Sequence, residues 1–302
     1  SIEFAPYISA YTGGVVSSTS PILIELTNEL PAVELDAAFK KNPFSFTPAL
    51  KGSTRWLNNK TICFDPEPGQ LKAGVLYNAQ FRLKEVKDVE KSLEKFPFSF
   101  RVMPKSFKAD IYPIHVSSSS PQLVTIEGVL HLNDIADLET VEQMISIDSK
   151  AFKNLSLDIK QGEQPLSYVF RLDSIQKQNE ETSIQLTING KPFGVDKKFE
   201  QKITIPSVET FSYMGLRKIH QPENGLEITF SEPVSDTQDL TGLISIPEIN
   251  SYVTQVKENK VYIYFETKKS GTISVDIDQG LKNRTNRKLN KASSIFHLKR
   301  LT

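Results

Sequence analysis

The chain is poor in the residues that most directly assign a chemistry. Its 302 residues include one cysteine, one tryptophan, three methionines and four histidines, and 36 basic residues balance 36 acidic ones. A lone cysteine, Cys63, can form neither an internal disulfide nor a cysteine-based metal cluster, so the cysteine count does not indicate a redox compartment. The formal net charge of zero excludes a protein that binds nucleic acid through excess positive charge.

Long hydrophobic runs are also missing. No stretch approaches the ~18 to 20 consecutive apolar residues of a membrane-spanning helix. Residues 1–4 are not a basic region followed by an apolar one, as a signal peptide would require. With 38% hydrophobic and 24% charged residues, the composition is that of an ordered soluble protein. We therefore expect no transmembrane segment in this chain and no extensive disorder.

The common local motifs of catalysis and nucleotide binding do not occur. The sequence has no Gly-x-Ser-x-Gly, no phosphate-binding Gly-x-x-x-x-Gly-Lys and no Gly-x-Gly-x-x-Gly. The histidines lie far apart, outside any His-Glu-x-x-His arrangement, and we expect them to face solvent: His115, His131, His220 and His297. We predict no enzyme activity and no catalytic, cofactor-binding or metal-ligating residue. Carboxylates brought together from distant strands, as in an unrecognised hydrolase, are the alternative.

Cys63 is a weak candidate for a reactive group. It alternates with Ile62 and Phe64, so we expect it to point away from the core as a small structural residue. A reactive thiol needs positive surroundings that lower its pKa, and the local sequence supplies none.

Residues 276–280, Asp-Ile-Asp-Gln-Gly, have the alternating acids of the first half of a calcium loop. An EF-hand also needs a bidentate glutamate at its twelfth position, where this chain has Arg287. We expect instead that Val275 and Ile277 continue a strand with the acids exposed, and that Gly280 starts a turn.

What the sequence has in abundance is period-two alternation, which predicts an all-β chain. In residues 75–83 every second side chain is apolar, so one face should pack in a core and the other should face water. Residues 96–102 repeat the pattern, with Pro97 indicating an edge position or a strand start. Similar segments are residues 22–26, 124–127, 155–159, 166–172, 184–188, 226–230, 261–265 and 273–277. Short helices are an alternative at residues 88–95 and 140–145.

Three domains follow from this rhythm. Proline-containing segments after strand-like stretches place boundaries near residues 104 and 208, giving domains 1–103, 104–207 and 208–302. About 100 residues and roughly seven short strands per domain match an immunoglobulin-like antiparallel sandwich, held by burial alone. Serine-rich residues 17–21 and 117–121 occupy the same place in domains 1 and 2 and predict a turn before a hydrophobic strand.

Segments of the first and third domains follow one another in a recognisable order. In domain 1 they are residues 8–17, 20–24, 44–48, 51–56, 62–66 (with Phe-Asp-Pro) and 71–77 (Leu-x-x-Gly-x-x-Tyr); in domain 3 they are residues 226–234, 239–244 and 280–282. This order resembles the amino-terminal macroglobulin-like domains of bacterial alpha-2-macroglobulins and, more loosely, bacterial immunoglobulin-like modules. Domain 2 matches mainly by length and strand rhythm. The resemblance implies three consecutive macroglobulin-like sandwiches.

The resemblance implies a secreted or envelope-attached protease trap, in which a bait segment is cut and a Cys-Gly-Glu-Gln thioester captures the attacking protease. Cys63 is followed by Phe64 and Asp65, so the thioester is absent, and the strand rhythm leaves no long stretch for a bait. We therefore expect a non-catalytic scaffold fragment without cofactors. Its partners would be the remaining domains of a longer parent chain and target proteases. Its location would be the periplasm, cell envelope or extracellular space, with a lipid anchor on a removed N-terminal segment as an option.

A cell-surface adhesin or glycan-binding array of the same modules is the alternative function, because fold does not fix function. Tyr262 and Tyr264, on the outward side of a predicted strand, are the best candidates for a glycan-binding face. For Trp56 we favour a core position over ligand stacking. Tyr77 is expected to fill a corner and to bond backbone through its hydroxyl, next to a tight turn at Gly74.

Overall fold

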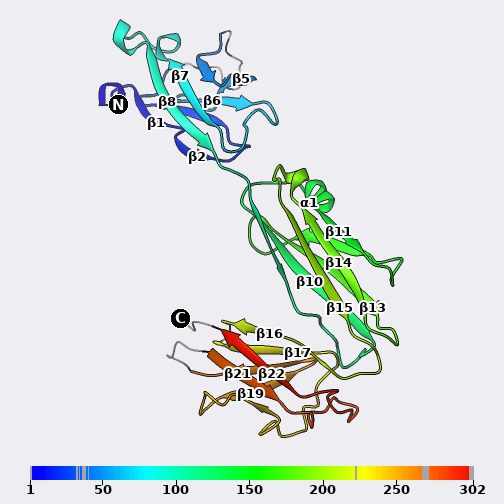
Figure 1. Cartoon of the computed structure of the whole chain (residues 1–302). Helices are drawn as coiled ribbons and strands as arrows, with labels where there is room; N and C mark the ends of the chain where they lie inside the picture. Colours follow the sequence, from blue (N-terminus) through cyan, green and yellow to red (C-terminus); the bar gives the residue numbers. More distant parts are fainter. Residues whose placement is uncertain are drawn as a thin grey trace. The chain divides into compact units, whose positions relative to one another are not determined.

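The computed structural model describes residues 2–298 except 32, 34, 36–38, 40, 222 and 267–271. Strands dominate this part of the chain and form six sheets of three or four strands each (Figure 1). Antiparallel pairs prevail, and β2 pairs with β8 in parallel. The predicted all-β, immunoglobulin-like fold class is therefore confirmed. Within the described residues, no helix has the length and apolar character needed to cross a membrane.

Sandwich 1 is formed by two sheets with the strand orders β1-β3-β6-β5 and β2-β8-β7-β4. Its strands are β1 (Ile8–Tyr11), β2 (Gly14–Val16), β3 (Ile22–Leu26), β4 (Phe44–Thr47), β5 (Gly52–Trp56), β6 (Thr61–Pro66), β7 (Leu76–Arg82) and β8 (Lys95–Val102), with 3-10 turns η1 (Ile2–Phe4), η2 (Leu83–Glu85) and η3 (Lys91–Leu93). Aromatic rings fill its core: the centroids of Phe46 and Phe64 lie 4.7 Å apart, and those of Phe44 and Phe81 lie 5.0 Å apart.

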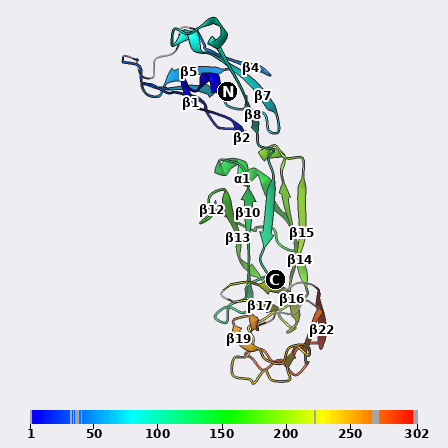
Figure 2. The ribbon, with the colours of Figure 1, turned by 90° about the vertical axis from the view of Figure 1, so that its left-hand side faces the viewer.

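Sandwich 2 has the sheets β12-β13-β10-β9 and β11-β14-β15. Its elements are β9 (Phe107–Ile111), β10 (Leu123–Leu132), α1 (Leu138–Met144), β11 (Ile145–Asp148), β12 (Leu157–Gln161), β13 (Ser167–Gln176), β14 (Thr182–Asn189), η4 (Lys191–Phe193) and β15 (Lys198–Ile205). The helix α1 lies at one end of this sandwich and packs against β11, β12 and β14 (Figure 2). It confirms the helical alternative at residues 140–145.

Sandwich 3 has the sheets β16-β17-β20-β19 and β18-β21-β22. Its strands are β16 (Tyr213–Ile219), β17 (Gly225–Phe230), β18 (Ile244–Ser245), β19 (Val253–Lys257), β20 (Lys260–Tyr264), β21 (Thr272–Ile277) and β22 (Ser293–Leu298). Its core is mainly aliphatic, with Ile228, Ile263 and Val275 among the fully buried side chains.

Residue contacts divide the chain into two compact units. Unit 1 comprises Ser1–Phe107, Leu132–Asp137 and Phe193–Val195; unit 2 comprises Lys108–His131, Leu138–Pro192 and Asp196–Thr302. Sandwiches 2 and 3 thus belong mainly to one unit. The strands of each sheet fall within one of the expected ranges 1–103, 104–207 and 208–302. The three-domain boundaries stay a prediction.

The predicted alternation is confirmed where one face of a strand is free. In β7 the side chains of Tyr77, Ala79 and Phe81 are buried, while Asn78 and Gln80 are exposed. In β8, Pro97 pairs with β7 on one side. On the other side β2 pairs only with residues 100–102, so Pro97 lies beyond the end of that pairing. The predicted edge position of this proline is therefore correct.

Two local predictions need correction. At residues 88–95 the short helix given as an alternative is reduced to the single 3-10 turn η3, after which the chain enters β8. Strand β17 is buried on both faces rather than one, and Glu227 on its second face is 2% exposed. The reason is that side chains from the neighbouring strands β16 and β20 cover it, as described below.

Candidate functional site

Buried polar side chains gather in unit 2 where the ends of sandwich 2 strands meet the loops of sandwich 3. We call this region the joint; its buried polar members are Lys177, Ser207, Ser231, Glu232, Asn259 and Asn283. Strand β13 ends directly before Lys177, β15 ends before the 206–212 link to β16, and β17 ends directly before Ser231. Strand ends therefore fix the backbone of the joint on both sides.

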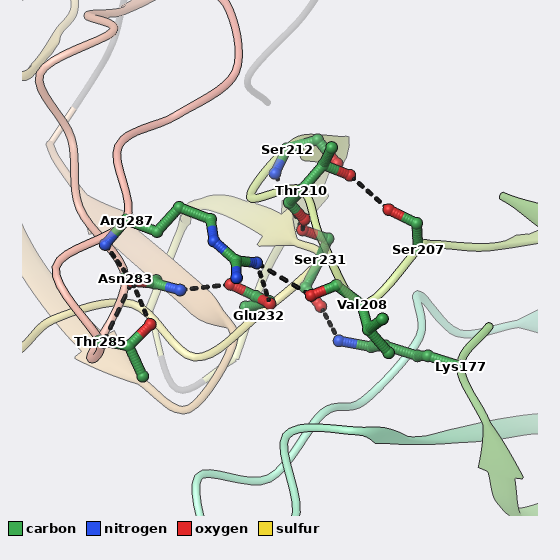
Figure 3. Close-up of polar contacts among 10 residues, drawn as sticks. All are labelled: Lys177, Ser207, Val208, Thr210, Ser212, Ser231, Glu232, Asn283, Thr285 and Arg287. Carbon is green, nitrogen blue, oxygen red and sulfur yellow. Dashed lines mark hydrogen bonds and ion pairs between the residues drawn. The ribbon is translucent and has the colours of Figure 1, made fainter. Parts of the chain in front are cut away.

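Lys177 is the least expected of these residues, because an ammonium group is rarely buried without a charged partner. Its side chain is 3% exposed, and Nζ donates a hydrogen bond to the Ser231 carbonyl oxygen at 2.6 Å (Figure 3). Burial lowers the pKa of Lys177 to about 8, against the attraction of the Glu232 carboxylate. Lys177 belongs to sandwich 2 and Ser231 to sandwich 3, so this bond crosses the joint.

Glu232 is held by a loop of sandwich 3. Asn283 donates from Nδ2 to one carboxylate oxygen of Glu232, and Arg287 donates to the other at 3.1 Å (Figure 3). The Asn283 side-chain oxygen accepts the backbone N–H groups of Thr285 and Arg287 at 3.0 and 2.7 Å, which fixes the loop that presents Arg287. Arg287 also donates to the Val208 carbonyl oxygen at 2.9 Å, in the link between the sandwiches.

On the other side of the joint, the β19–β20 turn inserts Asn259 into the end of sandwich 2. Asn259 is fully buried; its Nδ2 donates to the carbonyl oxygens of Ile114 and Phe230 at 3.0 and 2.9 Å. Its Oδ1 accepts the Val116 N–H at 3.1 Å. The amide thus pairs three buried backbone groups from both sandwiches, and such groups are costly when left unpaired.

Glu258 precedes Asn259 in the same turn and has a left-handed backbone, with φ of 53°. This conformation is unfavourable for a non-glycine residue, so surrounding contacts must hold it in place. The Glu258 carboxylate accepts the Ser118 N–H at 2.5 Å. Burial opposes the charged form of Glu258, but hydrogen bonding to the side chain and backbone of Ser118, together with the nearby Arg284 charge, lowers its pKa. Ser118 lies in the serine turn that the sequence predicts before β10.

A second polar group covers the outer face of β17. Glu227 accepts two hydrogen bonds from Arg217, at 2.9 and 3.1 Å, and its carboxylate lies 3.6 Å from Lys260 Nζ. Burial opposes the charged form of Glu227, but these cations outweigh it and lower its pKa. The Arg217 guanidinium also stacks over Tyr112 of sandwich 2, 5.3 Å from the ring centre.

The tyrosines expected on an outward face are there, but they do not form an open platform. Tyr262 and Tyr264 stack on each other with centroids 6.2 Å apart and planes at 6°. Burial and the neighbouring Glu227 carboxylate, to which Tyr262 is hydrogen-bonded, raise the pKa of Tyr262 to about 12. Since the rings face each other and one hydroxyl is engaged, this arrangement disfavours a flat sugar-stacking surface.

Three other residues singled out from the sequence have structural positions. Trp56 is buried and stacks on Phe39 with centroids 5.6 Å apart, as predicted for a core residue. The Tyr77 hydroxyl accepts the Lys72 N–H and donates to the Gln70 carbonyl oxygen, both at 3.1 Å, which confirms the predicted corner. Gly74 has φ of 78° in the adjoining turn.

Cys63 points away from the core, as predicted for a small structural residue, but polar side chains cover it and it is buried. Its side chain is 1% exposed, and Sγ donates to Asp65 at 3.3 Å. The neighbouring strand supplies Arg55, whose ion pair with Asp65 at 2.7 Å lies on the same face. Burial raises the pKa of Cys63 to about 12, which agrees with an unreactive thiol.

The histidines and the acidic pair are not brought together. His115 and His220 are exposed, and His131 is half-exposed with Nε2 3.3 Å from Asp110. The side chain of His297 lies outside the described residues. Val275 and Ile277 lie in β21, which ends at Ile277, and Gly280 lies in a turn, as predicted. In the part of the chain that the structure describes, no group of three or more His, Cys, Asp and Glu side chains is placed to hold a metal ion.

The joint itself escaped sequence analysis. Lys177, Glu232 and Asn259 come directly after or between predicted strands, where polar residues are ordinary. A weak signal is Ser231-Glu232-Pro233, in which two polar residues follow the apolar strand residue Phe230. Because each buried charge has its partners within the chain, the arrangement can fix the geometry of two sandwiches but presents no free acid–base pair.

No protein-family model and no curated protein matches the sequence. Among solved structures, the chain is similar to domains A168–A170 of titin, with 8% identity, a TM-score of 0.27 and coverage of 95% of this chain and 96% of that one. For the S-layer protein rSbsC the identity is 11% and the TM-score 0.29, with coverage of 91% of this chain and 34% of that one. For L,D-transpeptidase 3 from Mycobacterium tuberculosis the identity is 12% and the TM-score 0.25, with coverage of 61% of this chain and 78% of that one. At such TM-scores these likenesses carry no argument about function.

Proposed function

We propose that the chain is a non-catalytic scaffold segment, which holds β-sandwich modules in a fixed arrangement and acts through domain–domain and protein–protein surfaces. The observation that carries the proposal is Asn259, a fully buried side chain of sandwich 3 that pairs backbone groups of sandwich 2. A joint between freely moving modules would leave these groups to water. Here they are paired in one arrangement only.

The charges of the joint support the same function. Lys177 bonds the Ser231 carbonyl oxygen across the joint, and Arg287, which is held by Glu232, bonds the Val208 carbonyl oxygen in the link between sandwiches. Removing one partner would leave a buried group unpaired, so alternative orientations of the two sandwiches are penalised. We infer that these residues fix the relative orientation of sandwiches 2 and 3 more than they add to the net free energy of unfolding.

In its finer form, the proposal is that the parent protein is a bacterial alpha-2-macroglobulin-type protease trap in the periplasm or cell envelope. Its support is the order of sequence segments in domains 1 and 3, including the Leu-x-x-Gly-x-x-Tyr segment that builds the Tyr77 corner. The remaining domains of the parent and target proteases would be its partners. A coding region that continues into further macroglobulin domains with a bait segment would support this form, and one that ends at Thr302 would contradict it.

The scaffold function is tested by distance measurement in the full chain. Spin labels at Lys160→Cys and Val253→Cys would report on sandwiches 2 and 3, because both side chains are exposed whereas Cys63 is buried and resists labelling. We expect one narrow distance distribution by double electron–electron resonance. Adding Asn259→Ala should broaden it, and the exposed Asn58→Ala should not. A broad distribution in the parent chain would overturn the proposal.

A further inference from the structure

The two serine turns share a sequence pattern and the same internal hydrogen bonds. Both have the sequence Ser-Ser-x-Ser-Pro: the first serine turn is residues 17–21 and the second is residues 117–121. The Ser17 hydroxyl accepts the Thr19 N–H at 3.2 Å, and the Ser117 hydroxyl accepts the Ser119 N–H at 3.3 Å. The fourth residue of each turn donates its N–H to the carbonyl oxygen of the first, at 3.1 and 3.2 Å. The N–H of the second serine takes no part in these bonds and is available to another group.

In each turn, this second N–H donates to an acid far along the chain. Ser18 donates to Asp134 at 3.1 Å, and Ser118 donates to Glu258 at 2.5 Å, 116 and 140 residues further on. Asp134 follows β10 of sandwich 2, and Glu258 lies in the β19–β20 turn of sandwich 3. The first contact lies within unit 1 and the second within unit 2. A turn of one sandwich thus holds an acid of the sandwich that follows it in the sequence.

The first serine turn satisfies a buried charge without a cation. One oxygen of Asp134 accepts the Ser17 hydroxyl and the Ile135 N–H, and the other accepts the Ser18 N–H and hydroxyl. Asp134 is 2% exposed and has no ion pair within the described residues. Burial opposes its charged form, but the bonds from Ser17 and Ser18 outweigh burial and lower the pKa of Asp134. An amide in this place would set its own N–H donors against those of the turn, so the site selects a carboxylate.

The second serine of each turn is accounted for by its acid. The internal bonds use the hydroxyl of the first serine and make no demand on the side chain of the second. The Ser18 hydroxyl donates to Asp134 at 2.7 Å, and a side-chain hydrogen bond from Ser118 stabilises the charged form of Glu258. Both turns therefore offer a carboxylate the same two donors, the N–H and the hydroxyl of one residue.

We propose that the Ser-Ser-x-Ser-Pro turn is a carboxylate receptor, by which one sandwich recognises an acidic side chain of the sandwich that follows it. Asp134 occupies the first receptor and Glu258 occupies the second. This inference goes beyond the scaffold function, because it names the chemical group that sandwiches 1 and 2 each accept from the next sandwich. It does not depend on Asn259, whose amide pairs backbone groups instead.

The receptor is tested by removing its occupant and supplying a free carboxylate. In the full-length isotope-labelled chain, Asp134→Gly should leave the donors of the first serine turn unpaired, and sodium formate is small enough to replace the lost group. We expect saturable chemical shifts of the Ser18 amide, with a dissociation constant of about 10–100 mM for a ligand of so few atoms. Formamide, a neutral molecule of similar shape, should bind about tenfold more weakly at the same ionic strength. In the parent chain, where Asp134 fills the receptor, formate should leave the Ser18 amide unshifted.

Further variants locate the binding site. Added to Asp134→Gly, Ser18→Ala removes a donor hydroxyl and should weaken formate binding about tenfold. The matched change Ser53→Ala, at an exposed position of β5, should leave formate binding as it is. Glu258→Gly opens the second receptor in the same way, and glycine suits the left-handed backbone there. In that variant formate should shift the Ser118 amide and leave the Ser18 amide in place.

Three results would overturn the proposal: no saturable shift in either glycine variant, equal binding of formate and formamide, or equal loss of binding in Ser18→Ala and Ser53→Ala. Trp56 fluorescence shows whether Asp134→Gly leaves sandwich 1 folded, and Glu258→Gly repeats the test in unit 2 if it does not. The spin-label distances between sandwiches 2 and 3 are measured with both receptors filled, so they test the scaffold function separately.

Discussion

The β5–β6 turn of sandwich 1 and the β19–β20 turn of sandwich 3 occupy the same place in their sandwiches, but their side chains make different contacts. In sandwich 1, Leu26 donates its N–H to Lys60 and Leu30 donates to Asn59, both at 2.8 Å. In sandwich 3, Phe230 donates to Asn259 at 2.8 Å and Val234 donates to Glu258 at 2.9 Å. In both cases the first donor is the last residue of the second strand of its sheet, and the second donor lies four residues further along the chain.

The polar side chain of one turn bonds within the turn, and that of the other bonds the neighbouring sandwich. In sandwich 1, the Asn58 side-chain oxygen accepts the N–H groups of Lys60 and Thr61 at 2.9 and 2.8 Å, so the turn is closed on itself. In sandwich 3, Asn259 uses its amide for backbone groups of sandwich 2. A turn at this place thus makes either a self-contained end or a joint, depending on which polar side chain it presents and where that side chain points.

The largest expected effect is that of removing the Asn259 side chain, which distinguishes the two turns. Asn259→Ala removes a side chain that pairs the Ile114, Val116 and Phe230 backbone groups, so we expect unit 2 to lose about 2–4 kcal/mol of unfolding free energy. The matched change Asn58→Ala, at an exposed turn, should cost less than about 1 kcal/mol. Urea unfolding followed by circular dichroism measures both, and equal losses in the two variants would contradict the distinction.

The single tryptophan gives this measurement a built-in control. Trp56 lies in the core of sandwich 1, so its fluorescence reports the unfolding of that sandwich. Asn259→Ala should leave the fluorescence transition in place while it shifts the circular dichroism transition of unit 2. A shift of both by the same amount would show that the two units unfold together.

The next effect concerns Lys177. Its folded pKa of about 8 lies below the ordinary lysine pKa of 10.5, so the unfolded chain binds more protons between these values and stability rises as pH increases through this window. Relative to Lys177→Met, whose volume is similar and which has no charge, the parent chain should gain about 2–3 kcal/mol from pH 7.5 to 10.5. Urea midpoints of unit 2 at a series of pH values test this, and parallel pH profiles of the two proteins would contradict it.

Sandwich 1 should show the opposite pH dependence. The pKa of Cys63 is raised to about 12 in the folded chain, so the unfolded thiol ionises first and stability falls as pH rises above about 9. By pH 10.5 the parent chain should lose about 1–2 kcal/mol relative to Cys63→Ala. Trp56 fluorescence follows this transition, and rapid reaction of the folded thiol with a disulfide reagent at pH 8 would contradict the burial on which the prediction depends.

The sequence predicted features that depend on one strand and its immediate neighbours. The alternation in β7 and β8, the Tyr77 corner and the turn at Gly74 all follow from local spacing, because one buried face leaves a period-two pattern. The two serine turns were also predictable, since they repeat before β3 and β10.

What the sequence could not predict depends on where separate elements meet. Glu227 has the pattern of an exposed residue, and it is buried because Arg217 and Lys260 from neighbouring strands lie over it. Cys63 is buried on the outer face of β6 beneath a similar polar layer. Lys177 and Asn259 are polar residues at strand ends, and only the contact between sandwiches 2 and 3 distinguishes them from solvent-exposed loop residues.

The smallest expected effect is the contribution of the Glu258 charge to the stability of the joint, in addition to that of the Asn259 amide. Glu258→Gln keeps the side-chain length but replaces a charged acceptor of the Ser118 N–H by a neutral one, so we expect a loss of about 1 kcal/mol in unit 2. Since the folded pKa of Glu258 is lowered, its contribution is present above the unfolded value and is lost as pH falls through the folded one. The variant should therefore be less sensitive to acid than the parent chain.

Glu29→Gln is the matched control, because Glu29 accepts a hydrogen bond from Asn59 within sandwich 1 at an exposed site and should contribute almost nothing to stability. If both variants behaved alike at pH 7 and pH 4, the carboxylate of the joint would be a surface group with a fortuitous contact, and the difference between the two turns would rest on Asn259 alone.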